Sequence, residues 1–320
     1  MRGTLLFFLL SGLLMAEMLE RTQLLMGTYA TISIDKKDTQ MQQKAFELLR
    51  KVDQTLSSYQ SRADIYILNH QRETNLSFYT YEALQLSQRY YKETDGYFDI
   101  TVGSITKGLY HFGTAERIPS KRERERAVID FKGLHFTLQR AWLEEGVLVD
   151  LGGMGKGFGV DKTVAYLHEQ NITKGQVALS GDIHCLDQCK IAIQDPFGSG
   201  IIAEFTTKTA DMSISTSGNY RRYVKSKRDN HLINPKVKVP QQLFASITLI
   251  SYGNNSDIDA YATAASVMPL DAAILFLNRQ DVGYVLFTTG GDQYISEDLD
   301  RYVETMRFLG RGVPFECESI

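Results

Sequence analysis

The sequence predicts an α+β fold in one continuous domain. Strand-like segments follow one another in runs, whereas helical segments come in groups and do not alternate with single strands. This grouping favours an α+β fold over a doubly wound parallel sheet, in which strands and helices alternate. The chain has no internal repeat, low-complexity tract or proline-rich linker, so we expect a single domain over residues 17–320.

The first residues predict export. Arg2 precedes the apolar run Leu5–Ala16, which has the length of the apolar region of a signal peptide and is too short to span a membrane comfortably. Ala16 is a suitable residue to cleave after, although Leu14 stands where a small residue is usual. We therefore expect residues 1–16 to be a signal peptide or an N-terminal anchor, with a buried N-terminal helix as the alternative.

In the first half of the chain, alternation predicts a strand over residues 28–34. Apolar residues at helical spacing predict a helix over residues 39–55, and a second one that ends at the turn signal Asp95-Gly96. The mixed charges of residues 120–126 are typical of a solvated helix face or a loop.

The second half is richer in strands. Helices are expected over residues 161–170, 260–267 and 270–278. Strands are expected over residues 134–138, 147–149, 176–179, 190–193, 203–205, 212–215, 245–250 and 284–288.

Charge and cysteine content narrow the classes of function. The net charge of −3 offers no basic excess to neutralise phosphates, which argues against a nucleic-acid partner. Cys185 and Cys189 flank a short segment between strand-like stretches, where they could form a disulfide or remain unlinked thiols. No second Cys/His pair stands at a suitable spacing from them, so the spacing predicts no zinc site.

A glycine-rich run, Asp150–Asp161, is the clearest candidate for a ligand-binding segment. Its glycines leave backbone amides open to a ligand, Lys156 adds a positive charge, and the N-terminus of the following helix favours an anion. These features suit a phosphate or diphosphate, although the run matches neither common nucleotide-binding fingerprint. The alternative is a turn whose glycines pack two elements tightly together.

Two further segments contain candidate metal-binding and catalytic residues. Asp259 and Thr263 are four residues apart, so a helix would place both on one face as oxygen ligands of the kind Mg²⁺ prefers. The alternative for Asp259 is an N-cap at the start of a helix. His231 precedes Pro235 after a hydroxyl-rich strand end, Ser213–Gly218, and could serve as a proton acceptor or as a structural histidine.

Taken in order, these segments resemble the FAD:protein FMN transferase (ApbE-type) family over nearly the whole chain after the export segment. The matching blocks are Met26-Gly-Thr28, Leu56–Asn69, Thr94-Asp-Gly-Tyr-Phe-Asp-Ile-Thr-Val-Gly103, Asp150–Asp161, Ser180-Gly-Asp-Ile183, Ser215-Thr-Ser-Gly218, His231-x-Ile-Asn-Pro235 and Asp259-x-x-x-Thr263.

The resemblance implies a single ApbE-like domain with a mixed or antiparallel sheet flanked by helices. It implies an enzyme that uses Mg²⁺, takes FAD as substrate and transfers FMN to a Thr or Ser hydroxyl of an acceptor protein, releasing AMP. The acceptor implied is a membrane redox-pump subunit. The location implied is the periplasm or the outer face of the inner membrane.

The resemblance also assigns residues. His231 would be the catalytic base, and Mg²⁺ would be held by Asp259, Thr263 and the carbonyl of Gly153. FAD would be contacted by Met26, Tyr59, Tyr97, Phe98, Asp99, Asp150, Lys156 and Ile233.

The chain departs from the family pattern at three places. Ser180 replaces the first of two glycines, Asn234 replaces a frequent Asp, and Lys236–Val239 replaces a usual Thr-Gly. Two alternative functions remain: a Mg²⁺-dependent FAD pyrophosphatase, and a non-enzymatic exported flavin-binding protein. The joint presence of Asp259, Thr263 and His231 argues against the second, because holding FAD needs no base.

Overall fold

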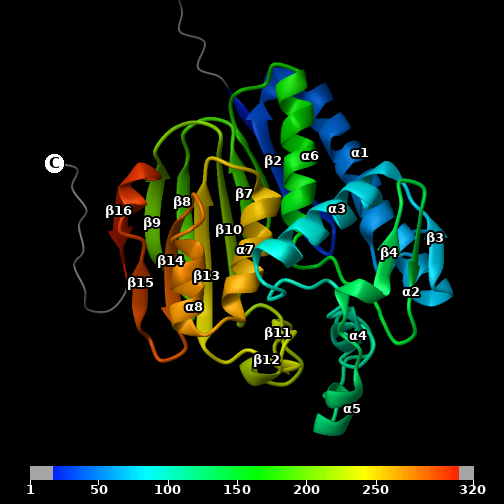
Figure 1. The fold of residues 1–320 in the computed structure, drawn as a ribbon. Coiled ribbons are helices and arrows are strands. Elements are labelled where there is room, and N and C mark those ends of the chain that lie inside the picture. The colour runs from blue at the N-terminus through cyan, green and yellow to red at the C-terminus, as the bar shows by residue number, and fades with distance from the viewer. Residues whose placement is uncertain (1–16, 310–320) are drawn as a thin grey trace, which may run out of the picture.

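The computed structural model describes residues 17–309, and the expected export segment lies outside this range. An eight-stranded sheet forms the centre, and all of its strand pairs are antiparallel (Figure 1). In spatial order its strands are β1 (Met18–Leu25), β2 (Thr28–Asp35), β6 (Gln176–Leu179), β7 (Asp182–Cys185), β10 (Met212–Gly218), β13 (Phe244–Ser251), β14 (Gly283–Thr288) and β15 (Gln293–Ile295).

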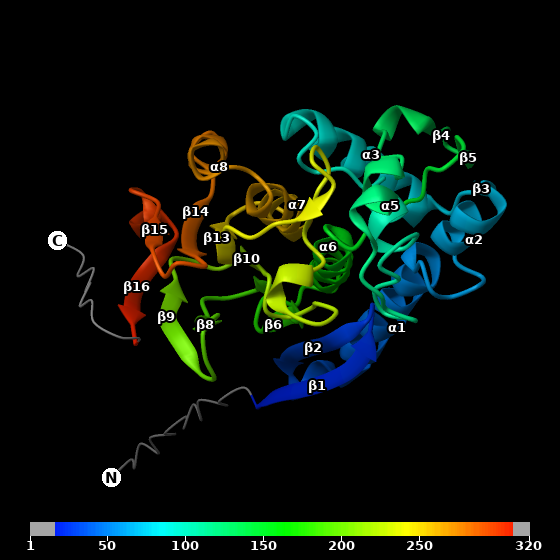
Figure 2. The ribbon, with the colours of Figure 1, turned by 90° about the horizontal axis from the view of Figure 1, so that it is seen from below.

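Helices cover one face of this sheet. They are α1 (Thr39–Leu56), α6 (Gly155–Glu169), α7 (Asn255–Ser266) and α8 (Leu270–Leu277). Seen from below, α6 and α7 lie side by side in the middle of the molecule (Figure 2). The helical spacing predicted α1 because Ala45, Leu49 and Val52 recur on one face, and all three are fully buried.

A three-stranded sheet covers the opposite face where β7, β10, β13 and β14 lie. It consists of β16 (Val303–Phe308), β9 (Ile201–Thr207) and β8 (Lys190–Gln194). The apolar residues of β14 alternate between the layers: Tyr284 and Leu286 face the helices, whereas Val285 and Phe287 pack with the small sheet. Every residue of β13 and β14 is therefore buried.

The remaining elements flank these layers. They are α2 (Asp64–Gln71), α3 (Phe78–Glu93), α4 (Gly103–Thr106), α5 (Lys121–Arg126), the sheet β3 (Glu73–Asn75), β5 (Arg140–Leu143) and β4 (Leu134–Phe136), the hairpin β11 (Ile233–Asn234) and β12 (Val239–Pro240), and the short 3-10 helices η1 (Lys36–Asp38), η2 (Phe131–Gly133), η3 (Lys227–Asp229) and η4 (Leu299–Arg301). The α+β prediction is confirmed. Within residues 17–309 no helix is both long and apolar enough to cross a membrane.

Helices α6 and α7, which contain several of the predicted site residues, begin earlier than predicted. We expected α6 to start at Asp161, but it starts at Gly155, inside the glycine-rich run. Glycines usually indicate a loop, but these lie inside the helix because α6 packs closely on α7. A Cβ on Gly157 would lie 2.6 Å from the backbone oxygen of Asn255 in α7. The alternative in which glycines pack two elements tightly is therefore correct for this part of the run, although the elements are two helices.

Helix α7 begins at Asn255, five residues before the predicted start, because its cap comes from another helix. The Asp161 carboxylate of α6 accepts hydrogen bonds from the backbone N–H groups of Asn255 and Ser256, at 2.7 and 2.9 Å. The first N–H groups of a helix need such an acceptor. A cap supplied from elsewhere in the chain leaves no local sequence signal.

The strand predicted over residues 147–149 was wrong. Leu148 makes only one parallel bridge, to Val102. The side-chain amide of Asn69 bonds both backbone groups of Val149, at 2.7 and 2.8 Å, in place of a neighbouring strand. Sequence patterns also missed the following helices and strands: α2, α4, β1, β3, β5, β7, β11, β12, β15 and β16.

The contact between α6 and α7 yields a stability prediction. Gly157→Ala is expected to destabilise the protein by about 1–3 kcal/mol, because its Cβ would overlap the backbone of α7. Gly155→Ala is the matched control from the same helical turn, since its Cβ would meet nothing closer than 3.9 Å. The control should be neutral or more stable by up to about 1 kcal/mol. Urea unfolding checks both, and equal stability of the two variants would contradict this account.

Candidate active site

Lys156 lies in the first turn of α6 between two buried carboxylates. Its Nζ pairs with Asp182 at the start of β7 and lies 3.3 Å from both carboxylate oxygens of Asp259 in α7. The side chains of Asp182 and Asp259 are only 1% and 2% exposed. Burial by itself would lower the pKa of Lys156, but the two negative charges outweigh it and raise the pKa. The lysine is therefore a fixed positive charge.

Asp259 is held within the second turn of α7. Its Oδ2 accepts the backbone N–H of Gly157 at 3.0 Å. The N-cap of α7 is Asn254, so the capping alternative for Asp259 was wrong. Burial, and then the charge of Asp182, raise the pKa of Asp259 to about 7. A carboxylate held in this way is stabilised in its charged form by a nearby cation.

Oxygen donors for a metal ion meet where α7 faces the loop before α6. Thr263 lies one turn after Asp259, and its Oγ1 donates to the carbonyl oxygen of Gly153 at 3.2 Å. A Cβ on Gly153 would lie 2.9 Å from the Thr263 methyl, so only glycine fits without a shift. A carboxylate, a hydroxyl and a carbonyl are hard donors that fit Mg²⁺. Binding of Mg²⁺ by these residues stays a prediction.

Asp182 and Ser215 were missed as site residues, although both lie in segments that the resemblance had matched. They are direct partners on the paired strands β7 and β10. Ser215 Oγ donates to Asp182 Oδ1 at 2.5 Å, and so the carboxylate that pairs with Lys156 is also fixed from the sheet. Strand register brought the two together, and no spacing rule in the sequence shows register.

A second group of polar side chains surrounds Asp150. Thr106 Oγ1 donates to its Oδ2 at 2.6 Å, and Lys107 Nζ lies 3.5 Å from the same oxygen. Burial would raise the pKa of Asp150, but Lys107 and the hydrogen bonds from Thr106 and Gly152 lower it overall. Asp150 is therefore ionised and paired.

Tyr59 completes this second group. Its hydroxyl donates to the carbonyl of Phe112 at 2.8 Å and accepts from Arg222 at 2.8 Å and from Lys107. Lys107 Nζ also lies 4.1 Å from the centre of the Tyr59 ring. Lys107 and Arg222 are cations that the sequence analysis did not identify, because neither stands in one of the matched segments.

His231 lies beside Arg222. Its Nδ1 is 3.1 Å from the carbonyl oxygen of Arg222. A carbonyl only accepts, so Nδ1 carries the hydrogen and Nε2 is the nitrogen left to accept a proton. Burial lowers the pKa of His231 to about 4. The imidazole is therefore neutral at pH 7, which a general base requires.

Met26 and Tyr97 have partly accessible side chains near these groups. Met26 packs on α6, where a Cβ on Gly159 would lie 2.6 Å from its sulfur. The ring of Tyr97 has Lys236 Nζ 4.1 Å from its centre. Their predicted contacts with FAD stay predictions.

The other predicted FAD contacts are buried. Phe98 packs edge-on against Tyr90, and Asp99 accepts two hydrogen bonds from Thr101, at 2.6 and 2.8 Å. Ile233 is 5% exposed and lies in a small apolar cluster that includes Ile105 of α4. All three residues are buried among other side chains, and direct contact with FAD stays a prediction for each.

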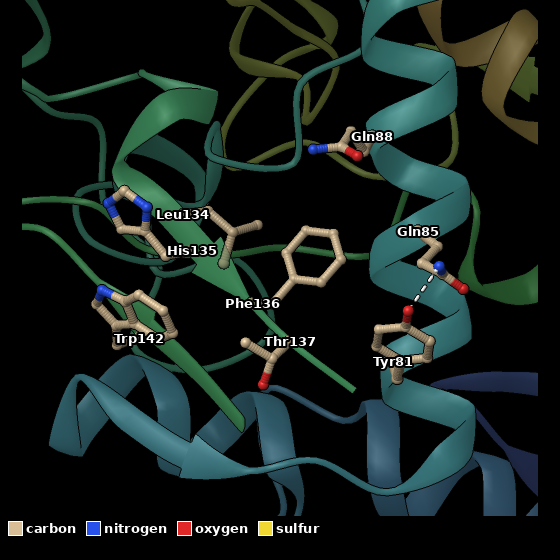
Figure 3. Close-up of a pocket in the computed structure, with 8 residues that line it drawn as sticks. All are labelled: Tyr81, Gln85, Gln88, Leu134, His135, Phe136, Thr137 and Trp142. Carbon is tan, nitrogen blue, oxygen red and sulfur yellow. Dashed lines mark hydrogen bonds between the residues drawn. The ribbon is translucent and has the colours of Figure 1, made fainter. Parts of the chain in front are cut away.

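A cavity of about 430 Å³ lies elsewhere, between α3 and the β4–β5 hairpin (Figure 3). Residues from both elements line it: Tyr81, Gln85, Gln88, Leu134, His135, Phe136, Thr137 and Trp142. None of the predicted site residues is among them, and the lining offers neither a lysine nor an arginine for a phosphate. The charged groups around Lys156 and Asp150 therefore remain the better candidate site.

Both cysteines lie where the chain passes from β7, in the large sheet, to β8, in the small sheet. The structure joins Cys185 and Cys189 in a disulfide. Of the two alternatives left open by the sequence, the bridged form is the one observed.

Comparison with solved structures gives the same fold. The ApbE protein of Thermotoga maritima superposes with a TM-score of 0.81 at 24% identity, covering 89% of this chain and 98% of that one. The flavin transferase ApbE from Vibrio cholerae superposes with a TM-score of 0.79 at 23% identity, covering 90% and 99%.

Sequence comparison finds relatives of similar length. A protein of Klebsiella pneumoniae named FAD:protein FMN transferase is 23% identical over 290 residues, 85% of this chain and 90% of its own. One of Haemophilus influenzae with the same name is 28% identical over 275 residues, 78% and 79% of the two chains. A sequence model described as the ApbE family matches residues 26–286, which include every predicted site residue. The chain belongs to the ApbE family.

Proposed function

We propose that this protein is a Mg²⁺-dependent FAD:protein FMN transferase, which moves FMN from FAD to a Thr or Ser hydroxyl of an acceptor protein and releases AMP. The observation that carries the proposal is the buried contact of Lys156 with Asp182 and Asp259, next to Thr263 and Gly153. The names of the relatives support the same reaction.

Positively charged side chains of the protein would bind FAD. Lys107, Lys156 and Arg222 supply positive charge to the two groups of site residues, and a diphosphate is the part of FAD that such charge attracts. Asp259, Thr263 and the Gly153 carbonyl would hold Mg²⁺, which when bound supplies further charge neutralisation at the diphosphate oxygens. Neutralisation of this kind stabilises the transition state more than the ground state, because charge builds up as the diphosphate splits.

His231 would act on the acceptor. Its unprotonated Nε2 takes the proton from the Thr or Ser hydroxyl as the hydroxyl oxygen bonds to the phosphorus of the FMN half. The bond between that phosphorus and the bridging oxygen breaks, and the bridging oxygen leaves with AMP. The proton on His231 is then lost to solvent, and the base is regenerated.

The proposed location is outside the cytoplasm, in the periplasm or at the outer face of the inner membrane, with a membrane redox-pump subunit as acceptor. The export signal expected in residues 1–16 supports this, as does the Cys185–Cys189 disulfide, because disulfides persist in oxidising compartments. Fractionation of cells that produce the full chain tests the location, and recovery only with cytosolic proteins would contradict it.

The function is tested by supplying all proposed reactants. Purified protein with FAD, Mg²⁺ and a threonine-containing acceptor peptide is expected to give the peptide–FMN adduct and AMP in equal amounts. Mass spectrometry and nucleotide chromatography measure the two products, and a peptide with valine in place of threonine is the control. FMN and AMP with an unmodified peptide would favour the pyrophosphatase. FAD that is bound but intact would favour a flavin-binding protein.

A further inference from the structure

A second cluster of polar side chains lies at the far end of α6 from Lys156. It contains His168 from the last turn of α6, His184 from β7 and Asp211 from the turn before β10. The Nε2 atoms of the two histidines face the same oxygen of Asp211, at 3.0 Å from His168 and 3.5 Å from His184. Ligand atoms of all three residues lie within 4.8 Å of one another.

His184 provides an independent sign that a ligand belongs in this cluster. The residue is 8% exposed, and its Nε2 is fully covered without a hydrogen-bond partner. Its Nδ1 lies 2.9 Å from Ser213 Oγ, its direct partner on β10. Whichever of these two atoms donates the hydrogen, Nε2 has no hydrogen-bond partner among residues 17–309 of the folded chain. Leaving such a buried atom unpaired costs about 1–3 kcal/mol.

We propose that His168, His184 and Asp211 form a binding site for a divalent transition-metal ion such as Zn²⁺, separate from the Mg²⁺ site. A cation between the three residues gives both histidine nitrogens and the carboxylate a partner. Zn²⁺ ligands lie about 2.0–2.2 Å from the metal, so tetrahedral neighbours are about 3.3–3.6 Å apart. The distances of 3.0 and 3.5 Å to Asp211 are close to this spacing.

The ligand atoms of this site differ in kind from those of the proposed Mg²⁺ site at Asp259. Imidazole nitrogen suits Zn²⁺, whereas Mg²⁺ prefers oxygen. Ser213 would orient the His184 ring through Nδ1, as the partners of metal-bound histidines commonly do. The side chains of His168 and Asp211 are 37% and 57% exposed, which leaves a path for the ion and room for a water as fourth ligand.

Sequence spacing could not indicate this site. The spacing excluded zinc at Cys185 and Cys189, which the structure joins to each other. The three proposed ligands stand far apart in the chain, and they come together because α6 packs on β7 and β7 pairs with β10. The same strand pair carries Asp182 and Ser215, two residues along from His184 and Ser213 on the same face. A bound ion would therefore tie the end of α6 to the strands that support the active site, and its expected effect is on stability.

The test is Zn²⁺ binding by the full chain in the presence of excess MgCl2. Titration calorimetry with ZnCl2 is expected to show one tight site, and Zn²⁺ should raise the thermal midpoint through linkage. His168→Ala and Asp211→Ala should each weaken binding by at least about 100-fold and abolish the thermal shift, because each removes a ligand. Both residues are at the surface, so these variants should fold.

His135→Ala is the matched control. His135 is also 37% exposed, and its Nε2 lies 3.0 Å from a carboxylate oxygen of Glu144, but it has no second histidine beside it. This variant should bind Zn²⁺ as the wild type does. Absence of a tight site in the wild type would overturn the proposal. So would wild-type affinity in His168→Ala and Asp211→Ala, or loss of the site in Asp259→Asn, which would place the ion at the active site.

Discussion

Asp259→Asn is expected to lower kcat/KM for transfer of FMN to an acceptor peptide by about 100- to 1000-fold. The substitution removes the negative charge that would hold Mg²⁺ and that pairs with Lys156, and losing one such electrostatic group costs about 100- to 1000-fold in comparable sites. Asparagine keeps the size of the side chain and an oxygen that can accept the Gly157 N–H. The contact between α6 and α7 should therefore survive.

The variant should also fold, and the sign of the pKa shift says why. Burial and Asp182 raise the pKa of Asp259 to about 7 in the folded protein, above its ordinary value. Its stability contribution is therefore present at low pH and is lost as the pH rises toward 7. A neutral amide removes this unfavourable ionisation, so the thermal midpoint of Asp259→Asn without metal should not fall at pH 7.

The measurement is the rate of AMP release and peptide labelling over a range of MgCl2 concentrations. Asp257→Asn is the matched control on the same helix: Asp257 pairs with Arg89 and Tyr90, away from Lys156, and its side chain is 23% exposed. It should keep transfer within a few-fold of the wild type. Full turnover by Asp259→Asn at the Mg²⁺ concentration that half-saturates the wild type would remove Asp259 from the metal site.

Local patterns predicted those parts of the site that depend on one element. The spacing of Asp259 and Thr263 placed both on one face of a helix, and the structure confirms that both belong to α7. The glycine-rich run marked where two elements approach closely, although its helix began earlier than expected. In each case the signal lies within a few residues, where helix geometry alone decides which side chains share a face.

The rest of the site depends on contacts between elements. Asp182 reaches Lys156 because α6 packs on β7, and Arg222 reaches Tyr59 across a large separation in sequence. The Asp161 cap of α7 is of the same kind. No local pattern records a partner in another element, so these groups became visible only in the folded chain.

His231→Ala is expected to slow transfer by about 100- to 10,000-fold while FAD affinity changes only a few-fold. The expected loss is that of a general base, and the groups proposed to bind the diphosphate are other residues. Flavin fluorescence measures affinity, and single-turnover labelling of the acceptor peptide measures transfer. His70→Ala, at an exposed position on α2, is the control and should match the wild type. Partial restoration of the rate by added imidazole would identify the lost group as the base.

The low pKa of His231 sets the pH dependence expected of both transfer and stability. Burial lowers the pKa of His231 to about 4, so Nε2 stays unprotonated as the pH falls from 7 and becomes protonated only near 4. On the acid side, wild-type kcat/KM should therefore show no loss near pH 6.5 that belongs to His231.

The stability of the protein depends on the same pKa. Between about pH 4 and 6.5 the folded protein binds fewer protons at His231 than the unfolded chain does, so this contribution to the free energy of unfolding is lost as the pH falls through that window. In His231→Ala this loss of stability at acidic pH should disappear, and so should fast transfer. If FAD binding is lost along with transfer, His231 is a positioning residue; if transfer is unchanged, it is not the base.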